Sequence, residues 1–399
     1  MPTSKKRICI ISFSRIAGDA RVLRQIEYLS SSYDLTVIGY GEERTPWPES
    51  NNIQWRPVSA ASTAAESPIK KLKKRALLLS GKLAAGNYEN WYWHNALFRN
   101  ALAQASASGA HAFHANDWNT LPVAIEAAKQ LGARVVFDAH EYAPLEFENR
   151  RLWRLLYAPV IRHILSKYAH AMDASITVAP AIADRYRREF ALDPVVILNA
   201  PAAHHEPSHR AMDFEKVRLV HHGASIPDRR LEVMIEALAL SHRRFTLHFL
   251  LMNSESDYVN QLRRLAEKLT PGRVFFSDAV PPDQVVARVA DFDMGLCYIA
   301  PTNYNYLVSL PNKFFDYIAA GLPVCIGPSP SMVEIVEHYG IGCTARSFEA
   351  SDLAAVLNGL TPERLAEMSG NARRAAGELN AEREMSKLLG IYERLWGEE

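Results

Sequence analysis

The sequence predicts an α/β protein with two Rossmann-like, doubly wound parallel-sheet domains. Short apolar runs alternate with helical stretches through most of the 399 residues, which is typical of parallel sheets built from βαβ units. With 48% hydrophobic residues, the chain is also larger than one ordinary core usually holds, so two domains are expected. Residues 201–212 are rich in turn formers and lack periodicity, which predicts a linker between the two series.

Short apolar runs give the expected strands of each domain. In the first series these are residues 7–12, 35–40, 112–114, 134–138, 174–178 and 195–198, with helices such as 20–31 between them. In the second series they are residues 217–222, 246–251, 274–277, 294–299 and 324–326, followed by a last helix at 382–396. We therefore place an N-terminal domain at 1–201, a C-terminal domain at 202–380 and a separate C-terminal helix at 381–399.

Charge and cysteine content narrow the class of protein. The 45 basic and 44 acidic side chains nearly cancel, which argues against a nucleic-acid-binding surface spread over the protein. The four cysteines lie far apart, mostly in apolar runs, and are expected to be buried thiols in a reducing compartment. The N-terminus lacks the longer apolar segment of a signal peptide or membrane span, so we expect a cytoplasmic protein.

The segment 309–324 predicts a short helix with a clear start and end. Ser309 is expected to cap the first turn, where Pro311 is also tolerated. Gly321 suits the left-handed position after the last turn, and Pro323 prevents continuation into the apolar run that follows.

Polar residues on this helix predict an anion site. The helix N-terminus offers free backbone N–H groups, Lys313 adds a full charge, and Asp316 lies one turn beyond Asn312 on the same face. A diphosphate followed by a ribose diol fits this order, which indicates a nucleotide-sugar site. The alternative is an ordinary amphipathic helix whose polar residues are merely solvated.

Several segments resemble one known family. Residues 311–324, Pro-Asn-Lys-Phe-Phe-Asp-Tyr-Ile-Ala-Ala-Gly-Leu-Pro-Val, are similar to the donor-site segment of retaining GT-B glycosyltransferases, specifically glycosyltransferase family 4. Further segments resemble that family in the same order along the chain: 19–24, 114–118, 137–142, 197–201, 221–225 and 229–231.

The resemblance implies a fold and a reaction. It implies two facing domains with a cleft between them, onto the first of which the last helix crosses back. It also implies transfer of a sugar, with retention of configuration, from a nucleotide diphosphate sugar to a saccharide or lipid-linked acceptor in cell-surface polysaccharide or glycoconjugate assembly. No metal or other cofactor is expected, because two protein cations would stabilise the charge on the leaving diphosphate.

The resemblance also assigns roles to residues of this sequence. It implies that Arg229 and Lys313 stabilise the leaving diphosphate and that His140 contacts the transferred sugar and the acceptor; without the resemblance, His140 is equally a histidine bonded to a neighbouring loop. The expected donor-binding residues are Gly223, Asn312, Asp316, Ser331, Met332 and Glu334. The expected acceptor-binding residues are Gly18, His114, Asp117 and Glu141.

Two of the acceptor-side residues have simpler explanations. Gly18 follows the first expected strand without completing a G-x-G-x-x-G dinucleotide motif, and it is also explained as a turn residue. Asp117 is also explained as the cap of the next helix.

The chain departs from the family pattern at several positions. The E-x7-E motif falls on Val308 and Asp316, an arginine is replaced by Ala224, and a Gly-Gly pair by residues 330–332, Pro-Ser-Met. These changes keep alternatives open: a nucleotide-sugar epimerase or hydrolase of the same architecture, or a sugar-nucleotide-binding protein of weak activity.

Two patterns mimic metal sites. Asp291 and Asp293 form a D-x-D sequence at the start of an expected strand, so we interpret them as structural. His204, His205 and His209 lie in the expected linker without a carboxylate or thiol at ligand spacing.

A basic and aromatic stretch predicts peripheral contact with anionic membrane. It contains Lys70, Lys71, Lys73, Lys74 and Arg75, followed by Tyr88, Trp91, Tyr92 and Trp93. The alternative is a basic helix face that only keeps the protein soluble.

Overall fold

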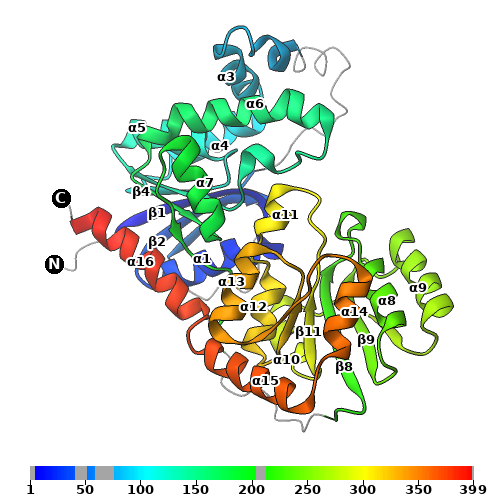
Figure 1. The fold of residues 1–399 in the computed structure, drawn as a ribbon. Coiled ribbons are helices and arrows are strands. Elements are labelled where there is room, and N and C mark those ends of the chain that lie inside the picture. The colour runs from blue at the N-terminus through cyan, green and yellow to red at the C-terminus, as the bar shows by residue number, and fades with distance from the viewer. Residues whose placement is uncertain (1–4, 41–51, 59–75, 204–212, 398–399) are drawn as a thin grey trace. The chain divides into compact units, whose positions relative to one another are not determined.

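The computed structural model describes residues 5–40, 52–58, 76–203 and 213–397, with elements labelled in Figure 1. These residues form two compact units. Unit 1 comprises Met1–Ile197 and Met385–Glu399, and unit 2 comprises Leu198–Glu384. Both divisions lie within a few residues of the boundaries that the sequence analysis places at 201 and 380.

Unit 1 is built on a seven-stranded parallel sheet with the order β3-β2-β1-β4-β5-β6-β7. Its strands are β1 (Arg7–Arg15), β2 (Asp34–Tyr40), β3 (Ile53–Pro57), β4 (Ala112–Asn116), β5 (Arg134–Ala139), β6 (Ala174–Thr177) and β7 (Val195–Val196). The strand order reverses between β1 and β4. Open α/β sheets bind ligands beyond the carboxyl ends of strands at such a switch point.

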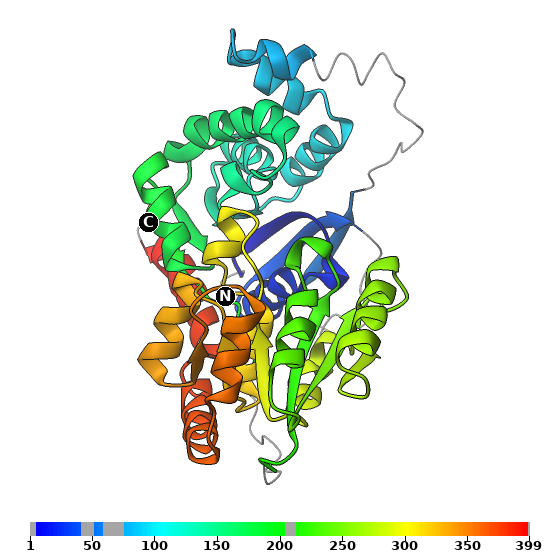
Figure 2. The ribbon, with the colours of Figure 1, turned by 45° about the vertical axis from the view of Figure 1, so that its right-hand side comes forward.

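Helices cover both faces of this sheet (Figure 1). They are α1 (Ala20–Ser30), α3 (Gly86–Trp93), α4 (Ala96–Ser106), α5 (Leu121–Leu131), α6 (Arg151–Tyr168), α7 (Pro180–Phe190) and α16 (Ala381–Gly397), with 3-10 turns η1 (Ile16–Gly18), η2 (Ala143–Leu145) and η3 (Ala169–Ala171). α1 begins after Asp19, whose carboxylate accepts a hydrogen bond from the Val22 N–H at 3.2 Å. α4 and α5 pack together on the face opposite α1 and α16 (Figure 2).

The last helix, α16, completes the core of unit 1. Leu388, Ile391 and Tyr392 are buried in the same apolar cluster as Ile10 and Val22. The final helix therefore packs on the first domain, as expected.

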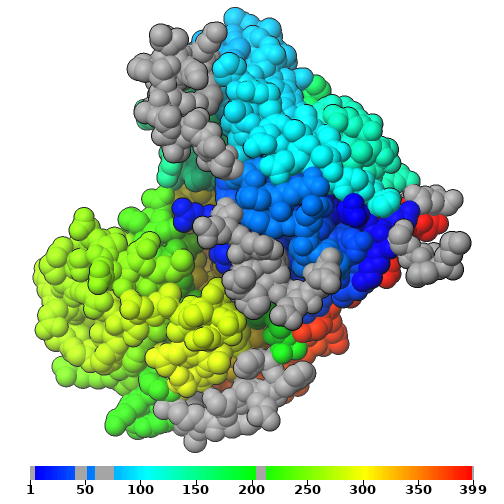
Figure 3. Space-filling view, turned by 180° about the vertical axis from the view of Figure 1, so that it is seen from behind, coloured from blue at the N-terminus to red at the C-terminus, as the bar shows by residue number. Residues whose placement is uncertain are grey.

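Unit 2 repeats the architecture with a six-stranded parallel sheet in the order β10-β9-β8-β11-β12-β13. Its strands are β8 (Val217–Ala224), β9 (Phe245–Met252), β10 (Val274–Asp278), β11 (Met294–Cys297), β12 (Val324–Ile326) and β13 (Gly342–Thr344). The order reverses between β8 and β11. β10 is an edge strand, and its Phe275 is 44% exposed. The neighbouring α9 (Asp257–Leu269) forms part of the yellow-green surface in Figure 3.

The other helices of unit 2 flank this sheet. They are α8 (Glu232–Leu240), α10 (Val285–Val289), α11 (Tyr304–Val308), α12 (Asn312–Ala319), α13 (Pro330–Tyr339), α14 (Ala350–Asn358) and α15 (Pro362–Ala376), with 3-10 turns η4 (Pro227–Arg229) and η5 (Pro282–Gln284). Two parallel-sheet Rossmann-like units confirm the predicted fold class. The four cysteines are buried and unbonded, as predicted.

One predicted helix boundary is wrong. Ser309 does not cap α12, because residues 304–308 form a separate helix, α11, which Ser309 ends by donating its hydroxyl to the Tyr306 carbonyl at 3.1 Å. Pro311 occupies the capping position of α12 without a side-chain bond. The end of the helix is as predicted, with Gly321 in the left-handed conformation at φ 70°.

Candidate functional site

A buried lysine marks the start of α12. Lys313 is only 5% exposed, and its Nζ lies 3.0 Å from Nε2 of His221 on β8. Burial, and then the charge of Arg229, lowers the pKa of Lys313 to about 7. A lysine held in this way is not a solvated surface residue, so the amphipathic-helix alternative fails for Lys313.

Gly223 brings the backbone of β8 next to two cations. Its φ of 114° is a conformation that favours glycine, and a Cβ placed there would lie 3.5 Å from Nζ of Lys313 and 4.0 Å from Nη1 of Arg229. Arg229, in η4, donates Nη1 to the Ala224 carbonyl at 3.3 Å, and its buried Nε has no hydrogen-bond partner within the described chain. We call Gly223, Arg229 and Lys313 the cation site.

Asp316 lies one turn beyond the cation site on α12. Its Oδ2 is 3.3 Å from Nε2 of His222, the residue that precedes Gly223. The backbone N–H of His222 donates to the Tyr317 hydroxyl at 3.2 Å, which ties this end of β8 to α12. The end of β8 thus contains both the bend at Gly223 and His222, which pairs with Asp316.

The remaining expected donor residues are more scattered. Asn312 is exposed at the first position of α12. Ser331 and Met332 are buried in the first turn of α13, and Glu334 is exposed on the same helix. Ser329, which no sequence motif marks, is fully buried just before α13, and its hydroxyl lacks a hydrogen-bond partner in the described chain.

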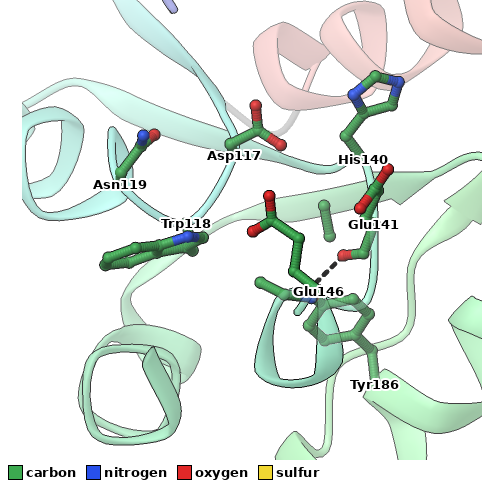
Figure 4. A pocket seen from close by; sticks show the side chains of 9 residues that line it. Asp117, Trp118, Asn119, His140, Glu141, Glu146 and Tyr186 are labelled. Atoms are coloured by element: carbon green, nitrogen blue, oxygen red, sulfur yellow. Dashed lines mark hydrogen bonds between the residues drawn. The ribbon is translucent and has the colours of Figure 1, made fainter. Parts of the chain in front are cut away.

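Unit 1 contains a polar pocket of about 180 Å³ at the carboxyl ends of β4 and β5. It is lined by Asp117, Trp118, Asn119, Ala139, His140, Glu141, Ala143, Glu146 and Tyr186. Figure 4 shows the carboxylates of Asp117 and Glu146 turned toward its interior, with the Trp118 ring at one side. We call it the acidic pocket. It brings together three of the expected residues, Asp117, His140 and Glu141.

Two acids of this pocket hold their protons unusually tightly. Burial raises the pKa of Asp117 to about 6. Burial, together with the charges of Glu141 and Asp117, raises the pKa of Glu146 to about 8. Glu146 was not anticipated because it follows η2, several residues after β5, where no sequence motif marks it.

Local backbone structure fixes how these residues are presented. Asp117 has φ 65°, and its N–H donates to the Asp138 carbonyl at 3.0 Å, which turns the chain at the end of β4. The Tyr186 hydroxyl donates to the Glu141 carbonyl at 2.8 Å and accepts from the Ala143 N–H at 3.2 Å. The cap of α5 is Thr120, so Asp117 does not serve as a simple helix cap.

His114 and Gly18 lie outside the acidic pocket. His114 is completely buried, with Nδ1 2.9 Å from the Tyr392 hydroxyl and Nε2 4.0 Å from Asp138, and burial lowers its pKa to about 4. It does not line the acidic pocket, because β4 alternates its side chains and His114 points to the α16 face. Gly18 ends η1, is exposed, and does not line the pocket either.

Arg21 in the segment 19–24 forms a buried ion pair with Asp138. Nε of Arg21 lies 2.6 Å from Asp138, whose pKa the guanidinium lowers although burial acts in the opposite direction. Gln25 also donates to Asp138 at 2.6 Å, and Arg21 reaches the Ile197 carbonyl at 3.1 Å. The network holds the end of β5, two residues before His140.

Of the two sequence patterns that resemble metal sites, only the D-x-D sequence lies in the described residues. Asp293 accepts a hydrogen bond from the Arg218 N–H at 2.7 Å, and Asp291 pairs with Arg288 at 2.7 Å, so both have structural partners. The histidines His204, His205 and His209 lie outside the described residues. Within the described residues, no group of three or more His, Cys, Asp or Glu side chains is placed to hold a metal ion.

The proposed membrane segment is only partly described. Its basic residues, Lys70 to Arg75, fall outside the described residues. Tyr88 and Tyr92 are buried, with Tyr92 stacked on Phe98 at 4.1 Å, so they belong to the packing of α3 rather than to an interfacial face. None of the helices in the described part of the chain is long and apolar enough to span a bilayer.

Comparisons with known proteins agree with this geometry. Residues 252–389 match a family model described as glucosyltransferase 3-like, C-terminal domain. This region includes α12 and the first turn of α13. No curated protein matches the chain at a significant level.

Solved structures of similar fold extend over nearly the whole chain. HepE of Anabaena, solved with UDP, is 16% identical at a TM-score of 0.69, covering 98% of this chain and 100% of that one. Sucrose-phosphate synthase of Thermosynechococcus elongatus is 14% identical at a TM-score of 0.71, covering 99% and 100%. The lipopolysaccharide outer core galactosyltransferase WaaB is 12% identical at a TM-score of 0.63, covering 97% and 99%. The chain therefore has the GT-B fold, with a C-terminal region similar to that of a glucosyltransferase.

Proposed function

We propose that this protein is a retaining glycosyltransferase that moves a sugar from a nucleotide diphosphate sugar to a hydroxyl group. The observation that carries the proposal is the cation site, where a buried lysine and an arginine meet at the Gly223 bend of β8. The glucosyltransferase-like region and a neighbour of the same fold solved with UDP-glucose support it.

Unit 2 supplies the groups that a nucleotide diphosphate needs. Breaking the bond between the sugar and the diphosphate leaves negative charge on the leaving group, and preorganised cations stabilise such charge in the transition state. Lys313 and Arg229 take this role, and Asp316 accepts hydrogen bonds from the ribose. Because protein cations provide the compensation, the reaction is expected to proceed without a metal ion.

Unit 1 supplies the groups that a sugar acceptor needs. Ionised carboxylates accept hydrogen bonds from hydroxyl groups, and a protonated carboxyl group, which the raised pKa of Glu146 favours, can also donate one. The Trp118 ring offers an apolar face for a sugar ring. We assign Asp117, Glu141 and the unanticipated Glu146 to acceptor binding, and His140 to contact with the transferred sugar and the acceptor. The similarity to WaaB favours a reaction in cell-surface glycoconjugate assembly.

Release of nucleotide diphosphate from a panel of nucleotide sugars, with and without saccharide acceptors, tests the proposal. We expect release that depends on an acceptor, with UDP-glucose as the first donor to try. Turnover without acceptor would instead identify a hydrolase, and tight donor binding without turnover would identify a binding protein. A Lys313→Ala variant is the specificity control, because its release should fall to background.

A further inference from the structure

His221 is completely buried, and both of its ring nitrogens have partners. Nδ1 lies 2.9 Å from the Leu296 carbonyl of β11, and Nε2 lies 3.0 Å from Nζ of Lys313. The ring also packs edge-on against Phe249 of β9, with centroids 5.8 Å apart. The position of this imidazole is therefore fixed by three strands and one helix.

The two contacts define the tautomer of the ring. A carbonyl oxygen only accepts hydrogen bonds, so Nδ1 must carry the proton. Burial keeps the pKa of His221 well below its usual value, so the ring is neutral and Nε2 presents a lone pair. That lone pair accepts a hydrogen bond from Lys313.

Other charged or titratable groups face Lys313 from the surrounding elements. Arg229 of η4 opposes the lysine charge, whereas Asp316 of α12 and Cys297 of β11 favour it. His222, the neighbour of His221 on β8, is engaged with Asp316. Among these groups of the described residues, His221 lies within hydrogen-bond distance of Nζ, at 3.0 Å.

We propose that His221 is a positioning residue for diphosphate binding: its neutral Nε2 holds the Lys313 amino group at the Gly223 bend, ready to pair with the phosphate groups of the donor. This inference rests on the proposed function of the cation site. It adds a residue that the sequence analysis did not assign to the site.

A pH-dependent binding signature follows from this arrangement. With a pKa of about 7, Lys313 is partly neutral in the empty site above neutral pH, whereas a bound diphosphate favours the charged ammonium. Binding should then take up a proton from solvent, and affinity should fall as pH rises. Removing the acceptor at His221 should move this fall to lower pH, because the ammonium loses a partner.

The experiment measures UDP binding by calorimetry from about pH 6 to 9, in buffers of different ionisation enthalpy. His221→Phe keeps a ring of similar shape but removes the acceptor, and a lost hydrogen bond to a charged group predicts binding weaker by about 10- to 100-fold. His221→Gln keeps an acceptor at similar reach and should restore most of the affinity. His248→Phe is the matched control, since this histidine lies on β9 with its ring stacked on Phe275.

Nitrogen NMR of the histidine rings provides a readout independent of binding. We expect His221 to be neutral with its proton on Nδ1 in the free wild-type protein. A proton on Nε2 or a charged ring would overturn the inference, even if His221→Phe does not fold.

Binding outcomes separate the two proposals. Absence of UDP binding by the wild-type protein would contradict the proposed function, while the tautomer would still test the contact with Lys313. Wild-type binding combined with an unchanged affinity and pH profile in folded His221→Phe would reject the role of His221 alone.

Discussion

The cation site of unit 2 and the acidic pocket of unit 1 occupy similar places in two similar sheets, yet they carry opposite charge. Each lies at the carboxyl ends of strands beside the point where the strand order reverses. The pKa of Lys313 falls to about 7 and the pKa of Glu146 rises to about 8. In each site, burial therefore disfavours the charged form of the side chain. Under the proposed function, the cation site binds phosphate and the acidic pocket binds hydroxyl groups.

The largest effect should come from removing a cation. Lys313→Ala and Arg229→Ala should each lower turnover by about 100- to 1,000-fold, the usual result of losing one preorganised group that stabilises transition-state charge. Steady-state kinetics with the donor varied would check this, with Lys268→Ala, an exposed lysine on α9, as the control. Near-normal turnover in both variants would show that the cation site does not stabilise the leaving diphosphate, and its proposed difference in role from the acidic pocket would be lost.

A smaller effect is expected at Asp316. Asp316→Asn should weaken donor binding by about 10-fold with little change in turnover, because a ribose contact is shared by the ground and transition states. Asp283→Asn, at an exposed position in η5, provides the matched substitution. A loss confined to turnover would instead place Asp316 among the groups that act on the leaving diphosphate.

The opposite pKa shifts predict opposite effects of pH on stability. The pKa of Glu146 is raised in the folded protein. Its contribution to folding stability is therefore present below its ordinary pKa of 4.5 and is lost as pH rises through about 8. The pKa of Lys313 is lowered in the folded protein. Its contribution to folding stability is therefore present above its ordinary pKa of 10.5 and is lost as pH falls through about 7.

Substitutions at these two residues should remove the corresponding slopes. Glu146→Gln should raise the free energy of unfolding at about pH 8 by roughly 1 kcal/mol or more, and Lys313→Met should do so at about pH 6. Urea unfolding across pH would measure both, with Glu267→Gln on the surface of α9 as the control. Parallel pH curves for Glu146→Gln and wild type would show that the pocket does not strain this carboxyl.

The smallest expected effect is that of a chelator. Excess EDTA should leave turnover unchanged, because Lys313 and Arg229 provide the positive charge and both Asp291 and Asp293 have arginine partners. If activity were lost and then restored by manganese or magnesium, a metal ion would be the partner of the diphosphate. The cation site would then not be the group that compensates its charge.

The sequence alone was sufficient for features that depend on periodicity. Alternating apolar runs located most strands, but β3 and β13 escaped notice because they are short edge strands with mixed composition. The helix at α12 was predicted with its correct end, since Gly321 and Pro323 act locally. Its start was misplaced because Ser309 is equally suited to ending α11, and only tertiary packing decides between the two.

The candidate site was harder to predict where it depends on contacts distant in sequence. Lys313 was recognised by its motif, whereas His221 was not, because the pair is separated by 92 positions and meets only in the folded sheet. His114 and Asp117 lie three positions apart at the end of β4. The alternation of strand side chains and the turn at Asp117 send the first into the core and the second into the pocket.

The placement of α16 has a consequence for synthesis in the cell. The strands of unit 1 precede those of unit 2 in the chain, but the core of unit 1 includes Leu388, Ile391 and Tyr392, which follow unit 2. Until α16 has emerged, the part of the apolar cluster that α16 covers beside α1 is exposed, although unit 2 has by then been translated. Unit 1 can therefore complete its core only after unit 2 has been synthesised, and in that interval its exposed apolar surface is open to misfolding and aggregation.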